Sequence, residues 1–160
     1  MYSLFKWMRR KSIHLAAIGI FMAIGMDAAG ADLALSGGDV GLTISTAAAG
    51  QQPDAVTDES TQLDWTTLVS DPTKKIVVQT GLVSPLFTLS VQALNISSGD
   101  GTSAGEVTLG SSPTDFIVSI PADIPPGDPG TCTLHYSASA TAAEGSGSDV
   151  HTITFTIVDQ

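Results

Sequence analysis

Few side chains in this 160-residue chain could do chemistry, and three of them lie near the C-terminus. Cys132 is the single cysteine, and His135 and His151 follow it. A thiol and two imidazoles could together bind a transition metal, or supply a nucleophile with its base. Either role requires that the fold bring the three side chains to one place.

The residues around Cys132 alternate strictly in polarity along TCTLHYSASATA, residues 131–142. Cys132, Leu134 and Tyr136 share one parity, whereas His135 has the parity of the serines and threonines. Period-two alternation is typical of a strand with one buried face. The pattern predicts that Cys132 is a small buried hydrophobic side chain, with a reactive thiol or a bridge between chains as the alternatives.

A second alternating run, HTITFTIV, begins at His151 and gives that histidine the parity of Ile153 and Phe155. The glycine-rich stretch EGSGSD separates the two runs and predicts a hairpin loop. The expected cross-strand pairs are Tyr136 with Phe155, Ala138 with Ile153, and Leu134 with Ile157.

This predicted hairpin places His135 and His151 on opposite faces, so the two imidazoles cannot share a metal ion. The sequence also lacks Cys-x-x-Cys and His-x-x-x-His spacings, which zinc sites commonly use. We therefore predict no catalytic, cofactor or metal site, with a surface position for His135 and a strand-end position for His151.

Two further groups of residues could bind ligands. Acidic residues cluster in predicted loops and could hold calcium, although solvated loop carboxylates explain them more simply; they are Asp54, Asp58, Glu59, Asp100, Glu106, Asp123 and Asp128. Exposed aromatic side chains could stack on sugars, but each one here has the apolar parity of its strand, which predicts core positions. These aromatic residues are Trp65, Phe87, Phe116, Tyr136 and Phe155.

The first 31 residues have the pattern of an export signal. Basic residues at 6–11 precede the apolar run SIHLAAIGIFMAIGM, and Ala29-Gly30-Ala31 offers a small-x-small cleavage site. The apolar run is shorter than the roughly 20 residues of a spanning helix. We expect cleavage after Ala31, secretion or a cell-surface or periplasmic location, and membrane contact only through the uncleaved signal.

Strong acidity is the main property of the remaining residues, 32–160. Lys74 and Lys75 are the only basic residues there besides histidine, against fifteen acids, so the formal charge is 2 − 15 = −13. Such a surface repels phosphate backbones and anionic lipids. Nucleic acid is therefore excluded as an expected partner.

The pattern of short apolar runs separated by turn-forming residues in 32–160 predicts one all-β domain. Short runs rich in Val, Ile and Thr recur between Gly, Pro and Asp clusters, as in an antiparallel β-sandwich of immunoglobulin-like or Greek-key type with about seven or eight strands. Strands are expected near 39–46, 62–69, 75–80, 85–96, 105–110, 115–120, 131–143 and 150–158. Residues 47–60 and 120–130 are expected to form exposed loops.

The segment just after the signal is ambiguous. Leu33 and Leu35 alternate with polar or small residues, but the alternation changes parity across Ser36-Gly37-Gly38. Residues 32–38 could therefore be a tail that donates a strand to a neighbouring subunit, or a frayed terminus, and we favour the frayed terminus.

The signal, the Thr- and Ser-rich strands, the runs YSASATA and HTITFTIV, and the scarcity of basic residues are similar to those of secreted bacterial surface β-sandwiches, including fimbrial and pilus-type subunits. Two features depart from chaperone-assembled pilins, because there is no cysteine pair and the chain ends Val158-Asp159-Gln160 without an aromatic residue. The resemblance implies a non-catalytic structural or adhesive subunit that self-associates or joins other surface subunits. The alternative is a secreted module that binds a glycan, with calcium as a possible aid.

Overall fold

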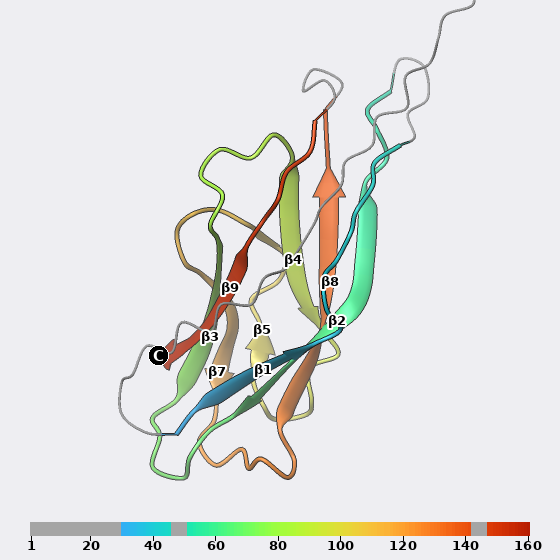
Figure 1. The fold of residues 1–160 in the computed structure, drawn as a ribbon. Coiled ribbons are helices and arrows are strands. Elements are labelled where there is room, and N and C mark those ends of the chain that lie inside the picture. The colour runs from blue at the N-terminus through green and yellow to red at the C-terminus, as the bar shows by residue number, and fades with distance from the viewer. Residues whose placement is uncertain (1–29, 46–50, 142–146) are drawn as a thin grey trace, which may run out of the picture.

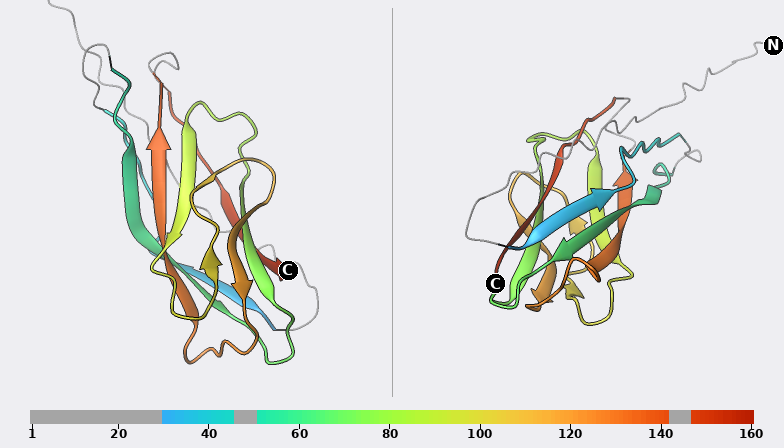
Figure 2. Two further views of the ribbon diagram at one scale, coloured as in Figure 1. Left: turned by 180° about the vertical axis from the view of Figure 1, so that it is seen from behind. Right: turned by 60° about the horizontal axis from the view of Figure 1, so that its bottom comes forward.

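The computed structural model describes residues 30–45, 51–141 and 147–160, and these residues form nine strands and no helix. The strands are β1 (Asp32–Ser36), β2 (Val56–Thr66), β3 (Lys74–Thr80), β4 (Thr88–Leu94), β5 (Thr102–Ser103), β6 (Val107–Thr108), β7 (Thr114–Ile120), β8 (Gly130–Ser139) and β9 (Ile153–Asp159). They build two antiparallel sheets, ordered β1-β2-β8-β4-β6 and β5-β7-β3-β9 (Figures 1 and 2). This all-β arrangement agrees with the predicted β-sandwich. The predicted signal lies almost wholly outside the described residues.

Successive strands alternate between the two sheets. After β2, every connection leads from one sheet to the other, so strands that follow each other in sequence do not pair. The predicted hairpin of residues 131–143 and 150–158 is therefore wrong. β8 pairs with β2 and β4, whereas β9 pairs with β3 in the other sheet. The connection of thirteen residues from 140 to 152 is long enough to cross between the layers.

The predicted side-chain parity holds even though the predicted pairing does not. Cys132, Leu134 and Tyr136 are each at most 1% exposed, and they face the core from β8. Ile153 is buried in the opposite sheet, and Phe155 packs against the core with its ring centroid 5.3 Å from that of Phe116. Alternation thus identified which side chains are buried, because a strand buries the same face whichever strand lies beside it. All five aromatic residues predicted to be in the core contribute to it.

The N-terminal part of the domain differs from the prediction. Residues 32–36 are neither a frayed terminus nor a free tail, because β1 pairs along its whole length with β2, from Asp32 opposite Thr66 to Ser36 opposite Gln62. The strand predicted near 39–46 is not part of either sheet over the described residues 39–45. Its alternation still has a structural role, since Val40, Leu42 and Ile44 are buried in the core.

The loop predicted for residues 47–60 is shorter than expected. β2 begins at Val56, and its register with β8 shifts between Asp58 and Thr61. The shift places Glu59 and Ser60 opposite the single residue His135, which is a β-bulge. The acids and polar residues of this segment suggested a loop, but pairing with β8 makes residues from Val56 onward part of strand β2. The proline-rich loop at 121–129 is confirmed as irregular.

Gly130 allows Trp65 to pack against the start of β8. The two residues are directly opposite each other, and a Cβ added at Gly130 would lie 2.3 Å from Trp65 Nε1. The Trp65 indole also donates a hydrogen bond of 3.1 Å to the Asp100 carbonyl oxygen. The indole therefore occupies the space where a side chain at position 130 would lie.

We expect Gly130→Ala to destabilise the fold by about 1–3 kcal/mol, because the new methyl group must displace a buried indole. Urea unfolding followed by tryptophan fluorescence measures this free energy of unfolding. Gly110→Ala is the matched control, because a Cβ added at Gly110 would meet nothing within 4 Å. Equal stability of the two variants would contradict this account of the packing.

Candidate interaction surface

Cys132 lies in the core and not at a reactive site. The side chain is a free thiol that is 1% exposed. Burial raises the pKa of the Cys132 thiol to about 12, with the nearby Asp64 carboxylate adding to the effect of desolvation. The thiolate is the nucleophilic form, so this residue has the properties of a buried hydrophobic side chain, as predicted.

The two histidines lie in different environments and do not meet. His135 sits on the outer face of the sheet that contains β8, where its Nδ1 is 2.7 Å from Glu59 Oε1 across the bulge. His151 is 2% exposed and precedes the first residue of β9 in the other sheet. The predicted separation of the imidazoles is thus correct, although the predicted hairpin is not its cause.

Among residues 30–45, 51–141 and 147–160, no three His, Cys, Asp or Glu side chains are arranged to hold a metal ion. Several of the predicted loop acids have local hydrogen-bond partners instead. Asp58 accepts bonds from the amide and hydroxyl of Ser60, and Asp100 accepts one from the Ser97 hydroxyl. The Asp58 carboxylate thus stabilises the bulge of β2, and the Asp100 carboxylate stabilises its own turn.

A buried polar cluster that sequence reasoning missed precedes β9. Asp149 is 6% exposed, and its Oδ2 accepts hydrogen bonds from the amides of Leu86 and Phe87 at 2.6 and 3.0 Å. His151 Nδ1 lies 3.1 Å from Thr80 Oγ1, and His151 Nε2 lies 4.0 Å from Asp149 Oδ2. These contacts attach the segment before β9 to the loop that follows β3.

The Thr80 hydroxyl connects His151 to the loop that follows β3. Thr80 Oγ1 accepts a hydrogen bond from the Leu82 amide at 3.2 Å and also lies within hydrogen-bond distance of His151 Nδ1. Burial lowers the pKa of His151, and the Asp149 charge opposes that shift in part.

Thr80, His151 and Asp149 have the residue types of a nucleophile, a base and an acid, but their geometry does not suit catalysis. The Thr80 hydroxyl is 1% exposed, and it faces Nδ1 of an imidazole whose Nε2 has no hydrogen-bond partner within the described residues. A substrate carbonyl could not reach this hydroxyl without opening of the core. The cluster therefore acts as a structural clamp at the N-terminal end of β9.

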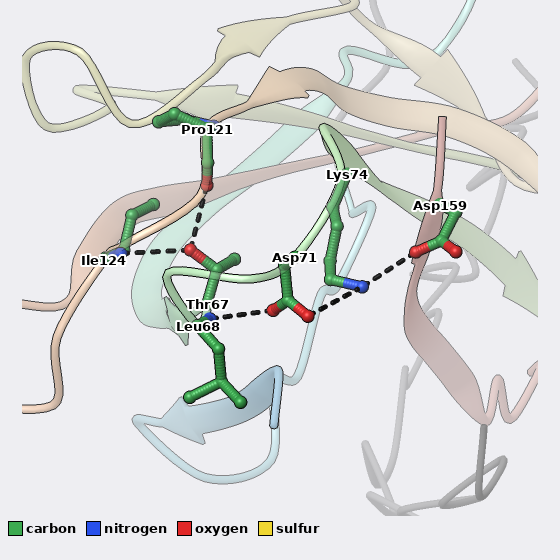
Figure 3. A network of polar contacts seen from close by, with 7 residues as sticks. All are labelled: Thr67, Leu68, Asp71, Lys74, Pro121, Ile124 and Asp159. Carbon is green, nitrogen blue, oxygen red and sulfur yellow. Dashed lines mark hydrogen bonds and ion pairs between the residues drawn. The ribbon is translucent and has the colours of Figure 1, made fainter. Parts of the chain in front are cut away.

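A second clamp holds the C-terminal end of β9. Lys74 Nζ is 2.7 Å from Asp159 Oδ1 and 3.6 Å from Asp71 Oδ1, and these contacts raise the pKa of Lys74 (Figure 3). Asp71 Oδ2 also accepts a hydrogen bond of 2.7 Å from the Leu68 amide. The Gln160 amide donates to the Thr73 carbonyl oxygen at 2.9 Å.

The loop that carries Leu68 is itself fixed to the proline-rich loop. Thr67 Oγ1 donates to the Pro121 carbonyl oxygen at 2.8 Å and accepts from the Ile124 amide at 3.0 Å (Figure 3). The Thr67 amide donates in turn to the Ile124 carbonyl oxygen at 3.0 Å. The loop that supports Lys74 and Asp159 is therefore tied to the segment that follows β7.

Between these two clamps, β9 is the last strand of its sheet, beside β3 (Figure 1). The Gly81 amide donates to the Thr152 carbonyl oxygen, and the Gln160 amide donates to Thr73, so even-numbered residues of this strand direct their backbone groups toward β3. The backbone groups of Ile153, Phe155 and Ile157 must then point away from β3. Within the described residues, no strand pairs with β9 on that side.

Strand β9 itself lacks several features that normally prevent pairing between proteins. Its sequence ITFTIVD contains no proline or lysine, its ladder with β3 has no bulge, and its one charge is at the terminal residue Asp159. By contrast, the edge strands β5 and β6 have two residues each. β1 is an edge strand of five residues that also contacts β9, but no described ladder joins the two. β9 is therefore the longest edge strand in the described part of the domain.

Exposed apolar side chains adjoin the N-terminal clamp. Val83, Leu86 and Val150 are 79%, 49% and 55% exposed. The bonds from the amides of Leu86 and Phe87 to Asp149 hold the two segments together. Leu86 and Val150 are therefore exposed apolar residues next to the two sides of the Asp149 contact.

No family model, curated protein or solved structure matches this chain. Over the residues that the structure describes, no helix has the length and apolar character required to cross a bilayer.

Acidification tests the clamp that contains His151. Because the pKa of His151 is lowered from 6.5 in the folded state, the unfolded chain binds a proton more readily. We expect the free energy of unfolding to fall as the pH drops below about 6.5, and His151→Asn to weaken this dependence between pH 7.5 and 5.5. Urea unfolding at each pH measures the free energy of unfolding. If this free energy changes equally with pH in the wild type and in His151→Asn, His151 is not the cause of the dependence.

Thiol labelling tests the position of Cys132. A pKa of about 12 in place of 9.0 lowers the thiolate fraction at pH 8 by about a thousandfold. We expect Ellman's reagent to label the native protein at least about a thousandfold more slowly than the urea-unfolded chain. Rapid native labelling, or a disulfide-linked species on a non-reducing gel, would instead favour a reactive thiol or a bridge between chains.

Proposed function

We propose that this chain is an exported, non-catalytic structural or adhesive subunit of a bacterial cell surface or extracellular matrix, and that it joins a neighbouring subunit through the outer edge of β9. In this proposal residues 1–31 direct export, and residues 32–160 are the mature domain. The repeated crossing of the chain between two antiparallel sheets supports an immunoglobulin-like or related Greek-key fold.

The observation that carries the proposal is the outer edge of β9, with which no strand in the described part of the chain pairs. A free row of backbone donors and acceptors can add a strand from another chain, and main-chain hydrogen bonds then supply the affinity. The clamps at Asp149 and Asp159 hold the strand ends in place, so less conformational entropy is lost when a partner binds. Half-buried Phe155 and Ile157 offer additional apolar surface to the added strand.

A secreted glycan-binding module remains the alternative function, but the described side chains offer it little support. The candidate stacking residues Trp65, Phe87, Phe116 and Tyr136 are at most 4% exposed, and Phe155 packs against the core. A sugar would have to be recognised by polar groups alone, such as the row of His135 and Gln92 on the outer face. A non-catalytic role for an assembling edge is the better account of the observed surface.

Thr156→Lys tests the role of this edge. Thr156 directs its side chain to the outer face of β9 and its backbone to β3, so the lysine adds a charge at the edge without removing a ladder bond. We expect the full chain, expressed in an exporting bacterial host, to reach the envelope or medium in assemblies larger than the monomer, and Thr156→Lys to shift it to the monomer in size-exclusion chromatography.

Thr133→Lys is the matched control for this experiment. It adds the same charge at a half-buried threonine on the outer face, but in the central strand β8, away from any free edge. We expect its assemblies to have the same size as those of the wild type in size-exclusion chromatography. Retention in the cytoplasm would reject export, and assembly that is unaffected by Thr156→Lys would reject the β9 edge as the point of association.

A further inference from the structure

We infer that the partner of β9 is β9 of a second copy of this chain, paired antiparallel about a two-fold axis at Thr156. This inference rests on the proposed function, because it identifies the neighbour that the edge accepts. The four-stranded sheet β5-β7-β3-β9 would then continue through the pair into a second identical sheet. Such an isologous contact closes on itself and forms a dimer.

The backbone parity of β9 permits this pairing. Ile153, Phe155, Ile157 and Asp159 direct their backbone groups to the free edge, and an antiparallel copy presents the same set. With the axis at Thr156, Phe155 lies opposite Ile157 of the second copy, and Ile153 lies opposite its Asp159. This register is the one that aligns the complete strand, residues 153–159, with itself.

The side chains are compatible with the same register. Phe155 would meet Ile157 of the second copy on the core side, an aromatic–aliphatic pair that occurs twice because of the symmetry. On the outer face, Thr156 would meet Thr156 of the second copy, and Thr154 would meet its Val158. Asp159 faces an isoleucine and not another acid, so no like charges are directly opposed.

The other long edge is a poorer partner for β9. Antiparallel pairing of β1 with β9 of a second copy would bring Asp32 toward the end that carries Asp159. β1 is also two residues shorter, since it has five residues against seven. Self-pairing of β9 therefore gives more main-chain bonds with less electrostatic repulsion.

The overall charge makes the expected dimer dependent on salt. Residues 32–160 carry a formal charge of −13, from two lysines and fifteen acids, so two copies repel each other at low ionic strength. Salt screens this repulsion over about 10 Å at 0.1 M. The main-chain bonds at the edge are not weakened in the same way, so added NaCl should favour association.

Engineered cysteines test the register directly, in purified residues 32–160 with Cys132→Ala. Residues opposite each other in a non-hydrogen-bonded antiparallel pair have Cα atoms about 4.5 Å apart, within the range that a disulfide spans. We expect Thr156→Cys to form a disulfide-linked dimer under mild oxidation. Thr154→Cys alone should remain unlinked, whereas a mixture of Thr154→Cys and Val158→Cys should give the mixed dimer.

Charge complementation provides a second test that needs no oxidation. Thr156→Lys and Thr156→Glu should each dimerise at least about tenfold more weakly than the wild type in sedimentation equilibrium, and an equimolar mixture should recover dimers. Thr133→Lys should dimerise as the wild type does. If the wild type stays monomeric up to millimolar concentration in 0.5 M NaCl, or if neither cross-linking nor mixing behaves as stated, the self-pairing is wrong.

The failure of this inference can be distinguished from failure of the proposed function. If Thr156→Lys disrupts the assemblies in the exporting host while the purified wild type stays monomeric, the β9 edge binds another subunit and only self-pairing is rejected. If Thr156→Lys changes neither the assemblies in the exporting host nor the dimerisation of the purified protein, both proposals are rejected.

Discussion

The pairing of β9 with β3 is the interaction on which the rest of this structure depends. It places the last strand in the sheet opposite β8, so that Ile153 and Tyr136 reach the same core from different layers. It also makes β9 the end of its sheet. If β9 paired with β8 instead, it would have to displace β2 or β4, which both pair with β8.

Sequence patterning predicted the buried faces well because alternation is a property of one strand. The parity of Cys132, Leu134 and Tyr136 fixes which side is buried, whatever strand lies beside it. Alternation does not identify the strand that pairs with it, because pairing depends on the path of the connecting segments. A glycine-rich stretch between two alternating runs suggested a hairpin, but thirteen residues are available from 140 to 152 and they allow a crossing.

The polar clamps illustrate a second limit of sequence reasoning. The parity of His151 with Ile153 indicated that this imidazole could be buried, but nothing in the sequence linked Asp149 to the amides of Leu86 and Phe87. That contact joins segments more than sixty residues apart, and it forms only because β3 and β9 are neighbours. Buried carboxylates need such donors, so the fold creates the site that accommodates the aspartate.

The most direct test of this account is amide hydrogen exchange along β9, measured by NMR on dilute residues 32–160, where association is weakest. If β9 pairs with β3 alone, the amides of Thr154, Thr156 and Val158 exchange slowly, and those of Phe155 and Ile157 exchange quickly. Equal protection of all five amides in the monomer, or the opposite alternation, would contradict the edge position of β9 and the proposals that depend on it.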